Sequence, residues 1–294
     1  MKAKKDYVVC PEDLASISPL FEGRMGQRLA KAVIRLFALD KINDLYARAC
    51  HKEGADFAAA LLQELKVQYR IGHPERLDAL PEGSFVCISN HPYGGLDGII
   101  LVDMLGHLRP DFKVMVNDLL SWIEAMDAHF ISVKPKGNGD MGINGKNLNG
   151  VRETLQHQKE GHPIGFFPAG AVSNLYVKPW GIRDRPWQES VIRLIQRSNV
   201  PVLPIRFFNG NSSLFYVLGL LDWRIRLLRM PREVFNKSKQ NPLVGIGEWI
   251  ESDVIQGIKD INELSDFLRN AVYTMPYPSD IQFATDFFKR NIGG

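Results

Sequence analysis

The chain has 294 residues, 45% of them hydrophobic, which is enough apolar material for one large α/β domain or two small ones. Its formal charge of +3 is too small to indicate nucleic-acid binding, although a mildly basic surface would suit acidic lipid or phosphate ligands. The three cysteines are widely spaced and have no histidine partners at metal-ligand spacing, so we expect reduced thiols and no bound metal.

Two helical patterns precede residue 72. Apolar residues recur at steps of three and four from residue 24 to residue 50, where the pattern allows a break near Asp40, and again from Phe57 to Tyr69. The first pattern has a basic rim and could lie on a membrane, but packing against the rest of the protein is the preferred interpretation. We therefore assign residues 1–71 to an N-terminal helical unit and residues 72–294 to an α/β domain.

From residue 72 onward, short apolar runs typical of strands alternate with helical patterns. This alternation predicts a largely parallel sheet flanked by helices on both faces. The expected strands are 85–89, 113–116, 130–133, 164–167, 200–207 and 243–246, and the expected helices are 96–108, 119–127, 146–160, 187–198 and 253–273.

The turn between the strand at 85–89 and the following helix contains the first candidate for chemistry. Five residues separate His91 from Asp97, and two of them, Gly94 and Gly95, permit a tight turn that brings the carboxylate to the imidazole. A carboxylate on one ring nitrogen fixes the histidine tautomer and leaves the other nitrogen to take a proton from a hydroxyl. The same residues fit a helix start with an aspartate in its first turn and a structural histidine equally well.

Two later strands end in turns that could contribute to a site. Residues 165–174 form an apolar strand that runs into a Pro/Gly turn, and strand carboxyl ends form the ligand crevice of open α/β sheets. Residues 200–206 form a strand punctuated by prolines. Taken singly, each is more typical of a core strand with an ordinary turn.

Taken in order, these segments resemble the lysophospholipid (glycerolipid) acyltransferase family, and within it a bacterial hemolysin-like or ornithine-lipid-type branch. The likeness covers roughly residues 70 to 275. Residues 227–237 and 244–247 also resemble that branch. The motifs that carry the resemblance are Asn90-His91-Pro92 with Gly94-Gly95-Leu96-Asp97, Phe167-Pro168-Ala169-Gly170 with Ser173, and Val200-Pro201-Val202-Leu203-Pro204.

The resemblance implies an α/β acyltransferase fold and an O-acyl transfer. His91 would deprotonate a lipid hydroxyl that attacks an acyl thioester, Asp97 would orient His91, and no cofactor beyond acyl-CoA or acyl-ACP as co-substrate is expected. Backbone N–H groups near Gly94 or Gly170 are both candidates for stabilising the oxyanion. The expected substrate-binding residues are Asn90, Gly94, Gly95, Phe167, Pro168, Ala169, Gly170, Ser173 and Pro204.

The chain also departs from the family pattern. Most of the family has four residues between the histidine and the aspartate, a glutamate and an arginine where this chain has Ala169 and Val172, and a further arginine that is absent around residues 130–134. Because a phosphate prefers arginine forks or helix N-termini, we expect an acceptor other than glycerol 3-phosphate, such as a lyso amino-acid lipid or a lysophospholipid. Three lysines could compensate: Lys134, Lys136 and Lys178.

Contact with a membrane is expected to be peripheral, because no apolar run reaches the roughly 18 to 20 residues of a spanning helix and no export signal is recognised. We expect a cytoplasmic protein on the inner face of the membrane. The apolar run at 214–221, followed by Trp223 and arginines, could dock on a bilayer, but a buried helix is the preferred interpretation.

A non-catalytic lipid-binding protein on the same fold is the alternative, and a His91→Ala variant would separate the two. The GxGxxG match at residues 137–142 does not favour a dinucleotide site, because the following helix starts too late and the next strand lacks the acidic residue. The sequence does not indicate the oligomeric state.

Overall fold

A computed structural model describes residues 5–117, 120, 122–133 and 148–291. Its centre is an eight-stranded sheet with the strand order β10-β1-β9-β8-β2-β5-β3-β4. Five neighbouring pairs are parallel, whereas β9 runs antiparallel to β8 and β10 runs antiparallel to β1. The strands are β1 (Arg70–Gly72), β2 (Val86–Ser89), β3 (Lys113–Asn117), β4 (Phe130–Val133), β5 (Ile164–Phe166), β8 (Val202–Phe207), β9 (Leu243–Ile246) and β10 (Ile281–Phe283).

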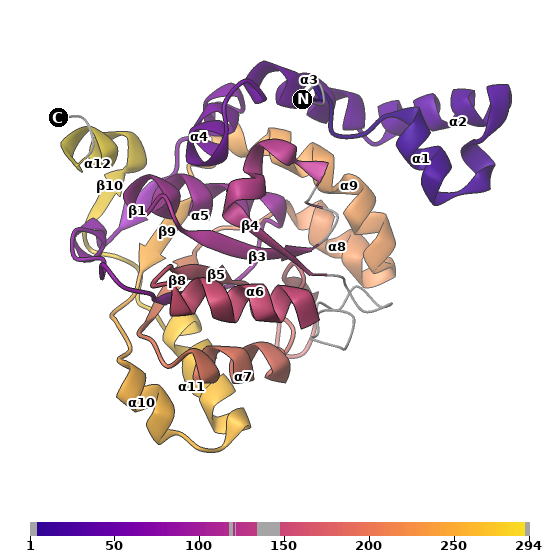
Figure 1. Ribbon diagram of the computed structural model, residues 1–294. Coiled ribbons are helices and arrows are strands. Elements are labelled where there is room, and N and C mark those ends of the chain that lie inside the picture. The colour runs from indigo at the N-terminus through magenta and orange to yellow at the C-terminus, as the bar shows by residue number, and fades with distance from the viewer. Residues whose placement is uncertain (1–4, 118–119, 121, 134–147, 292–294) are drawn as a thin grey trace.

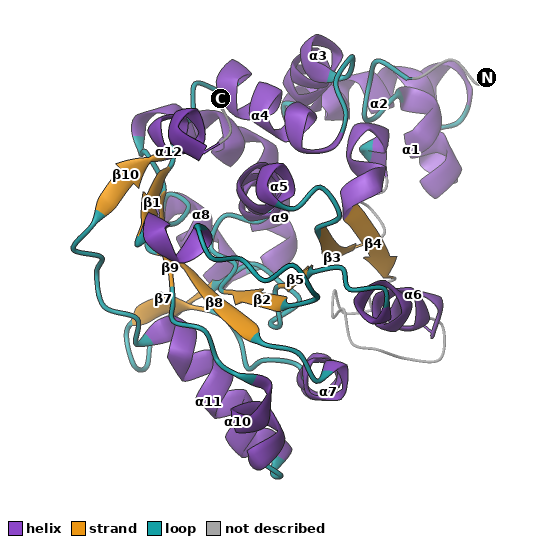
Figure 2. Ribbon diagram, turned by 60° about the vertical axis from the view of Figure 1, so that its left-hand side comes forward, coloured by secondary structure: helices purple, strands orange, loops and turns teal. Residues whose placement is uncertain are grey.

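Helices cover both faces of this sheet, as expected from the sequence (Figure 2). One face packs against α4 (Gly54–Glu64) and α5 (Gly95–Leu108), and the other packs against α6 (Leu148–Lys159), α7 (Glu189–Ser198) and α11 (Ile261–Tyr273). Alternate residues of one strand enter the two cores: Val114 and Val116 face the first, and Met115 faces the second. The predicted α/β fold with a largely parallel sheet is confirmed.

The N-terminal helices are α1 (Pro11–Ile17), α2 (Gly23–Leu36) and α3 (Leu39–Ala49), followed by α4. The break between α2 and α3 falls at Ala38, which has a φ of 57°, close to the break expected near Asp40. Helix α4 packs against α5, and the expected unit boundary at residues 71 and 72 falls inside β1.

Two expected helices differ from the structure. Over residues 124–127 the predicted α-helix is wrong, because Glu124–His129 form a six-residue 3-10 helix that packs against α4 and leads directly into β4. The predicted helix at 253–273 is two helices, α10 (Ser252–Gly257) and α11. Asp260 ends the interruption, since its side chain accepts hydrogen bonds from the N–H groups of Asn262 and Glu263 and caps α11.

Several elements were not expected. They include the strands β1 and β10, the hairpin β6 (Asn174–Tyr176) and β7 (Gly181–Arg183), the helix α9 (Trp223–Phe235), which follows the expected helix α8 (Ser213–Leu221), and the terminal helix α12 (Ala284–Asn291). Figure 1 shows α8 and α9 side by side on one flank of the molecule. Lys134, Lys136 and the GxGxxG match at 137–142 lie outside the described residues.

The apolar run at 214–221 forms α8, and the expectation that it is buried is wrong for one of its faces. Phe215 and Tyr216 are buried, whereas Leu214, Val217 and Leu221 are 50%, 47% and 74% exposed. The run is apolar on all sides, so the sequence alone does not show which face packs on the protein. Among the described residues, no helix is both long and apolar enough to cross a bilayer.

Candidate active site

Two loops that follow neighbouring parallel strands form the candidate site. The first leaves β2 after Ser89 and enters α5, and the second follows β5. Because β2 and β5 are parallel, both loops lie at the carboxyl edge of the sheet, where α/β proteins bind ligands. The N–H of Ser173 donates to the carbonyl oxygen of His91 at 2.9 Å, so the two loops are joined directly.

The structure brings His91 and Asp97 together. The imidazole Nδ1 lies 2.9 Å from the carboxylate Oδ2, and Asp97 is fully buried while the His91 side chain is 18% exposed. Gly94 makes this approach possible, since its φ of 84° lies in the left-handed region that favours glycine. A residue with a side chain would also meet the sulfur of Met230, because a Cβ at Gly94 would lie 2.7 Å from it.

Asp97 also starts the helix. Its Oδ2 accepts hydrogen bonds from the backbone N–H groups of Tyr93 at 2.9 Å and Gly94 at 3.0 Å. The sequence left a helix cap and a histidine partner as alternatives for Asp97. In the structure the same carboxylate has both roles, because it contacts the imidazole and accepts the two N–H groups. Burial raises the pKa of Asp97, while His91 and the two N–H donors oppose the increase.

The second loop forms a wall beside the imidazole. The ring of Phe167 lies over the ring of His91 with centroids 4.2 Å apart and planes inclined by 31°. The loop is held from outside, since Arg185 donates from Nε to the carbonyl oxygen of Ala169 at 2.7 Å. The predicted residues Phe167, Pro168, Ala169, Gly170 and Ser173 therefore lie in one loop next to His91.

Asp184 is a buried residue of this site that the sequence did not single out. Its Oδ1 accepts hydrogen bonds from the backbone N–H of His91 at 3.2 Å and from the hydroxyl of Ser173 at 2.5 Å. The indole N–H of Trp187 approaches its Oδ2 at 3.5 Å. Burial raises the pKa of Asp184. An aspartate between two arginines is typical of a solvated surface, so only the folded arrangement identifies its role.

Asn90 holds the end of β2 to β8. Its side-chain amide donates to the carbonyl oxygen of Phe207 at 2.9 Å and accepts from the N–H of Phe207 at 2.8 Å. These two bonds join the neighbouring strands where the loop that contains His91 leaves the sheet. The buried Asn90 thus supports the loop from behind His91.

The helices α8 and α9 also hold both loops. The Tyr216 hydroxyl donates to the carbonyl oxygen of Pro92 at 2.9 Å. The buried Arg226 donates to the carbonyl oxygens of Ser173 at 2.9 Å and Val172 at 3.1 Å. Through these two hydrogen bonds Arg226 fixes α9 to the loop beside His91.

A buried ion cluster anchors the C-terminal part of α9. Glu233 accepts hydrogen bonds from the N–H and hydroxyl of Ser212 at 2.9 and 2.7 Å and from Nε of Arg229 at 2.9 Å. The ammonium of Lys237 lies 3.4 Å from the same carboxylate and 5.2 Å from the centre of the Tyr93 ring. Residues 227–237, part of the resemblance seen in the sequence, thus pack against the loop that contains His91.

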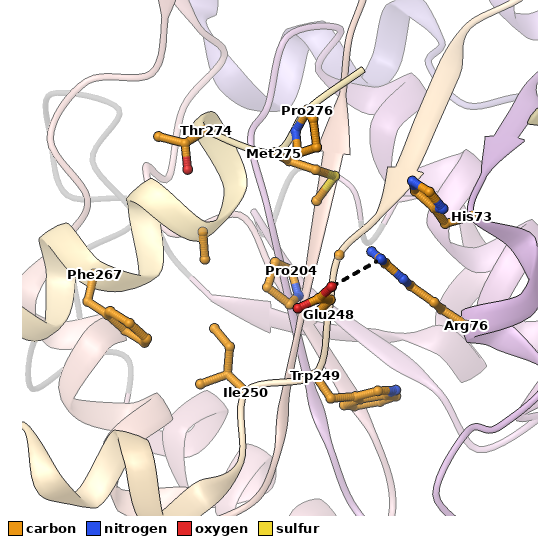
Figure 3. Close-up of a pocket in the computed structure, with 12 residues that line it drawn as sticks. His73, Arg76, Pro204, Glu248, Trp249, Ile250, Phe267, Thr274, Met275 and Pro276 are labelled. Atoms are coloured by element: carbon orange, nitrogen blue, oxygen red, sulfur yellow. Dashed lines mark hydrogen bonds and ion pairs between the residues drawn. The ribbon is translucent and has the colours of Figure 1, made fainter. Parts of the chain in front are cut away.

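Pro204, which was also expected in the substrate site, lies in the strand β8, and its place in that site stays a prediction. It pairs with Ile88 within the sheet and lines a cavity of about 400 Å³ together with Gly247 and Phe267 (Figure 3). This cavity lies where β9 ends, and β9 runs antiparallel to β8. It therefore opens at the sheet edge opposite the carboxyl ends of β2 and β5.

Comparison with known proteins agrees with the motifs. The model of the acyltransferase family matches residues 22–281. The chain is 26% identical over 243 residues to a lyso-glycine lipid O-acyltransferase of Bacteroides thetaiotaomicron, covering 80% of this chain and 85% of that protein. It is 25% identical over 244 residues to a lyso-glycine lipid O-acyltransferase of Phocaeicola vulgatus, covering 80% and 83%.

Among solved structures, the 1-acyl-sn-glycerophosphate acyltransferase PlsC of Thermotoga maritima is similar with a TM-score of 0.47 and 12% identity, over 84% of this chain and 86% of that one. The family match spans both loops of the candidate site, the strands β1 to β9 and the helices that support the loops. The protein therefore belongs to the acyltransferase family.

Proposed function

We propose that this enzyme transfers a fatty acyl group from acyl-CoA or acyl-ACP to the hydroxyl of a lyso amino-acid lipid or a lysophospholipid, as a step of membrane lipid synthesis at the cytoplasmic face of the membrane. The 2.9 Å contact between His91 and the buried Asp97 at the carboxyl edge of the sheet is the observation that carries the proposal. Family membership supports acyl transfer.

His91 acts as the general base in this proposal. The Asp97 carboxylate faces Nδ1 and favours the tautomer that carries its proton there, which leaves Nε2 free to take the proton of the acceptor hydroxyl. The alkoxide oxygen attacks the thioester carbonyl, and the tetrahedral intermediate collapses to an ester and a thiolate. The imidazolium returns its proton to the thiolate, so His91 ends the reaction in its starting state.

The first turn of α5 is the better candidate for the oxyanion site. The N–H of Gly94 already donates to Asp97, and the N–H of Gly170 donates to the carbonyl oxygen of Phe167 at 2.8 Å. The first N–H groups of a helix have no acceptor within the helix, and they favour negative charge. The exposed Gly95 starts α5 next to His91, so its N–H is the proposed donor.

The lining of the site favours an acceptor without a phosphomonoester. Ala169 and Val172 are buried apolar residues where the family pattern has a glutamate and an arginine, and Arg226 already donates to two backbone carbonyl oxygens. The two similar proteins are named for lyso-glycine lipid, which supports an amino-acid lipid as acceptor. Gly94, Gly95 and the loop from Phe167 to Ser173 form the proposed substrate wall.

Acyl transfer can be measured with purified protein, radiolabelled acyl thioester and separate acceptors. We expect label to enter lyso-glycine lipid or a lysophospholipid on a thin-layer plate. Replacing His91 with alanine removes the base, and base catalysis contributes about 100- to 10,000-fold, so the rate should fall by at least about 100-fold.

His73→Ala is the matched control, because His73 has a similarly half-buried side chain but lies at the opposite edge of the sheet. It should retain the full rate. Unchanged activity in folded His91→Ala would contradict the catalytic assignment. Selective acylation of lysophosphatidate would contradict the assignment of an amino-acid lipid.

A further inference from the structure

In the part of the chain that the structure describes, most exposed large apolar side chains lie on two segments beside the loops of the candidate site. Of 19 large apolar side chains exposed in the described residues, 11 belong to residues 174–183 or 213–235, which together are 33 of 294 residues. Single exposed apolar residues are normal, but a contiguous group marks an interaction surface. The 11 residues are Val177, Trp180, Ile182, Leu214, Val217, Leu220, Leu221, Trp223, Ile225, Leu227 and Leu228.

The two segments are neighbours in the fold. β6 packs against α8, and α8 packs against α9. Phe215 and Tyr216 of α8 pack with Val172 of the catalytic loop region, and Leu175 and Met230 pack against the same cluster. The β6–β7 hairpin and the α8–α9 helix pair therefore each use one side for packing on the loops of the candidate site. Their remaining apolar side chains are exposed on the other side.

The net charge of the same segments is positive. They contain six Lys or Arg and two Asp or Glu, a formal charge of +4, whereas the whole chain has +3. The other 261 residues together are thus slightly negative. Lys178, Arg224 and Arg232 are exposed among the apolar residues, and each hairpin has an exposed tryptophan, Trp180 or Trp223.

We propose that residues 174–183 and 213–235 form a docking surface for an anionic lipid bilayer, a role that rests on the lipid acceptor of the proposed function. An apolar face with tryptophan and a basic fringe matches the interface of an anionic membrane. Charge complementarity favours a bilayer over a second copy of this chain, because two such surfaces would bring like charges together.

Docking through this surface would place His91 close to the membrane. Tyr216 contacts Pro92, the residue after His91, and Arg226 contacts Ser173, which bonds to His91. An apolar face buried by about 5–10 Å in the headgroup region therefore lies only one layer of side chains from the base. A lipid hydroxyl could reach His91 while its acyl chain stays in the bilayer.

Vesicle flotation of the full chain tests the docking surface. We expect binding to phosphatidylcholine vesicles to strengthen when about 30 mol% phosphatidylglycerol is added, and to weaken with salt. Trp180→Asp and Leu221→Asp place a carboxylate at two exposed positions, so each should weaken binding about tenfold or more with an unchanged circular dichroism spectrum.

Met25→Asp is the matched control. Met25 is an exposed apolar residue of α2, 84% exposed, and lies outside the docking surface. It should bind vesicles as the wild type does. If Met25→Asp releases the protein and the two docking variants do not, the bilayer contacts α2 and the proposal is overturned. A dimer in sedimentation velocity that Leu221→Asp dissociates, with no vesicle binding, would overturn it in favour of a second copy.

Rates with two forms of acceptor separate this proposal from the proposed function. Trp180→Asp and Leu221→Asp should keep the wild-type rate on detergent-dispersed acceptor and lose most of it on vesicles. His91→Ala should bind vesicles normally and be inactive in both. Vesicle binding that depends on Trp180 and Leu221, with no acyl transfer by the wild type, would support the docking surface and contradict the proposed function.

Discussion

Asp184 offers a direct test of how the fold holds its proposed base. In Asp184→Ala, the backbone N–H of His91 and the hydroxyl of Ser173 lose their shared acceptor in a buried environment. We expect the variant to fold, with lower stability and with His91 held less firmly. Asp184 does not touch the reacting atoms in this proposal; it acts on His91 through the backbone.

The expected magnitudes follow from those two bonds. A hydrogen bond to a charged group contributes about 1.5–3 kcal/mol, so removal of two would lower the free energy of unfolding by about 3–6 kcal/mol. Relief from burying the carboxylate, whose pKa is raised by that burial, offsets part of this and leaves about 2–4 kcal/mol. A displacement of about 1 Å at a catalytic group can lower a rate about 100-fold, so kcat should fall by about 10- to 100-fold while KM changes little.

Asp184→Asn is the control for charge. Its amide oxygen can still accept from His91 and Ser173, and its NH₂ group would face only the weak 3.5 Å contact with Trp187. We expect kcat within about threefold of the wild type, because geometry is kept and only the charge assistance is lost. Urea denaturation and initial rates of acyl transfer measure both effects. Wild-type kcat in folded Asp184→Ala, or Asp184→Asn as slow as Asp184→Ala, would refute the positioning role.

Three further variants test other parts of the structure. Asn90→Ala removes both bonds to Phe207 and should lower the free energy of unfolding by about 2 kcal/mol in urea; a change below about 0.5 kcal/mol would contradict the supporting role. Gly94→Ala should lower the free energy of unfolding by about 1–3 kcal/mol and remove much of the activity, because a φ of 84° is strained for alanine and the new Cβ would meet Met230. Wild-type stability and rate in this variant would contradict the conformation of the turn at Gly94. Burial raises the pKa of Asp103 to about 6, above its value in the unfolded chain. The protonated group therefore contributes about 3 kcal/mol to the free energy of unfolding below about pH 4, and this contribution is lost as the pH rises through about 6. Asp103→Asn should lack this slope in denaturation curves at pH 4 to 7, and an unchanged slope would contradict the assignment.

Features that depend on neighbouring residues were predicted from the sequence. The strands β4 and β9 have the expected bounds, since a short apolar run between turn residues specifies a buried strand locally. The contact between His91 and Asp97 was also expected, because both residues lie in one turn whose shape depends on Gly94. The order of the motifs along the chain was sufficient to identify the family, and the family match to residues 22–281 confirms it.

Features that depend on distant segments required the tertiary structure. Asp184 was not recognised because its partner His91 is 93 residues away, and no local pattern connects them. The cavity beside Pro204 was not expected, because a strand motif does not specify which distant segments pack around its side chains. Gly247, which follows the antiparallel β9, and Phe267 of α11 line this cavity together with Pro204. For Leu214–Leu221 the sequence alone predicted an apolar helix. Which of its faces are buried depends on the distant segments that pack against it. In this fold they cover one, around Phe215 and Tyr216, and leave the other exposed beside the catalytic loop.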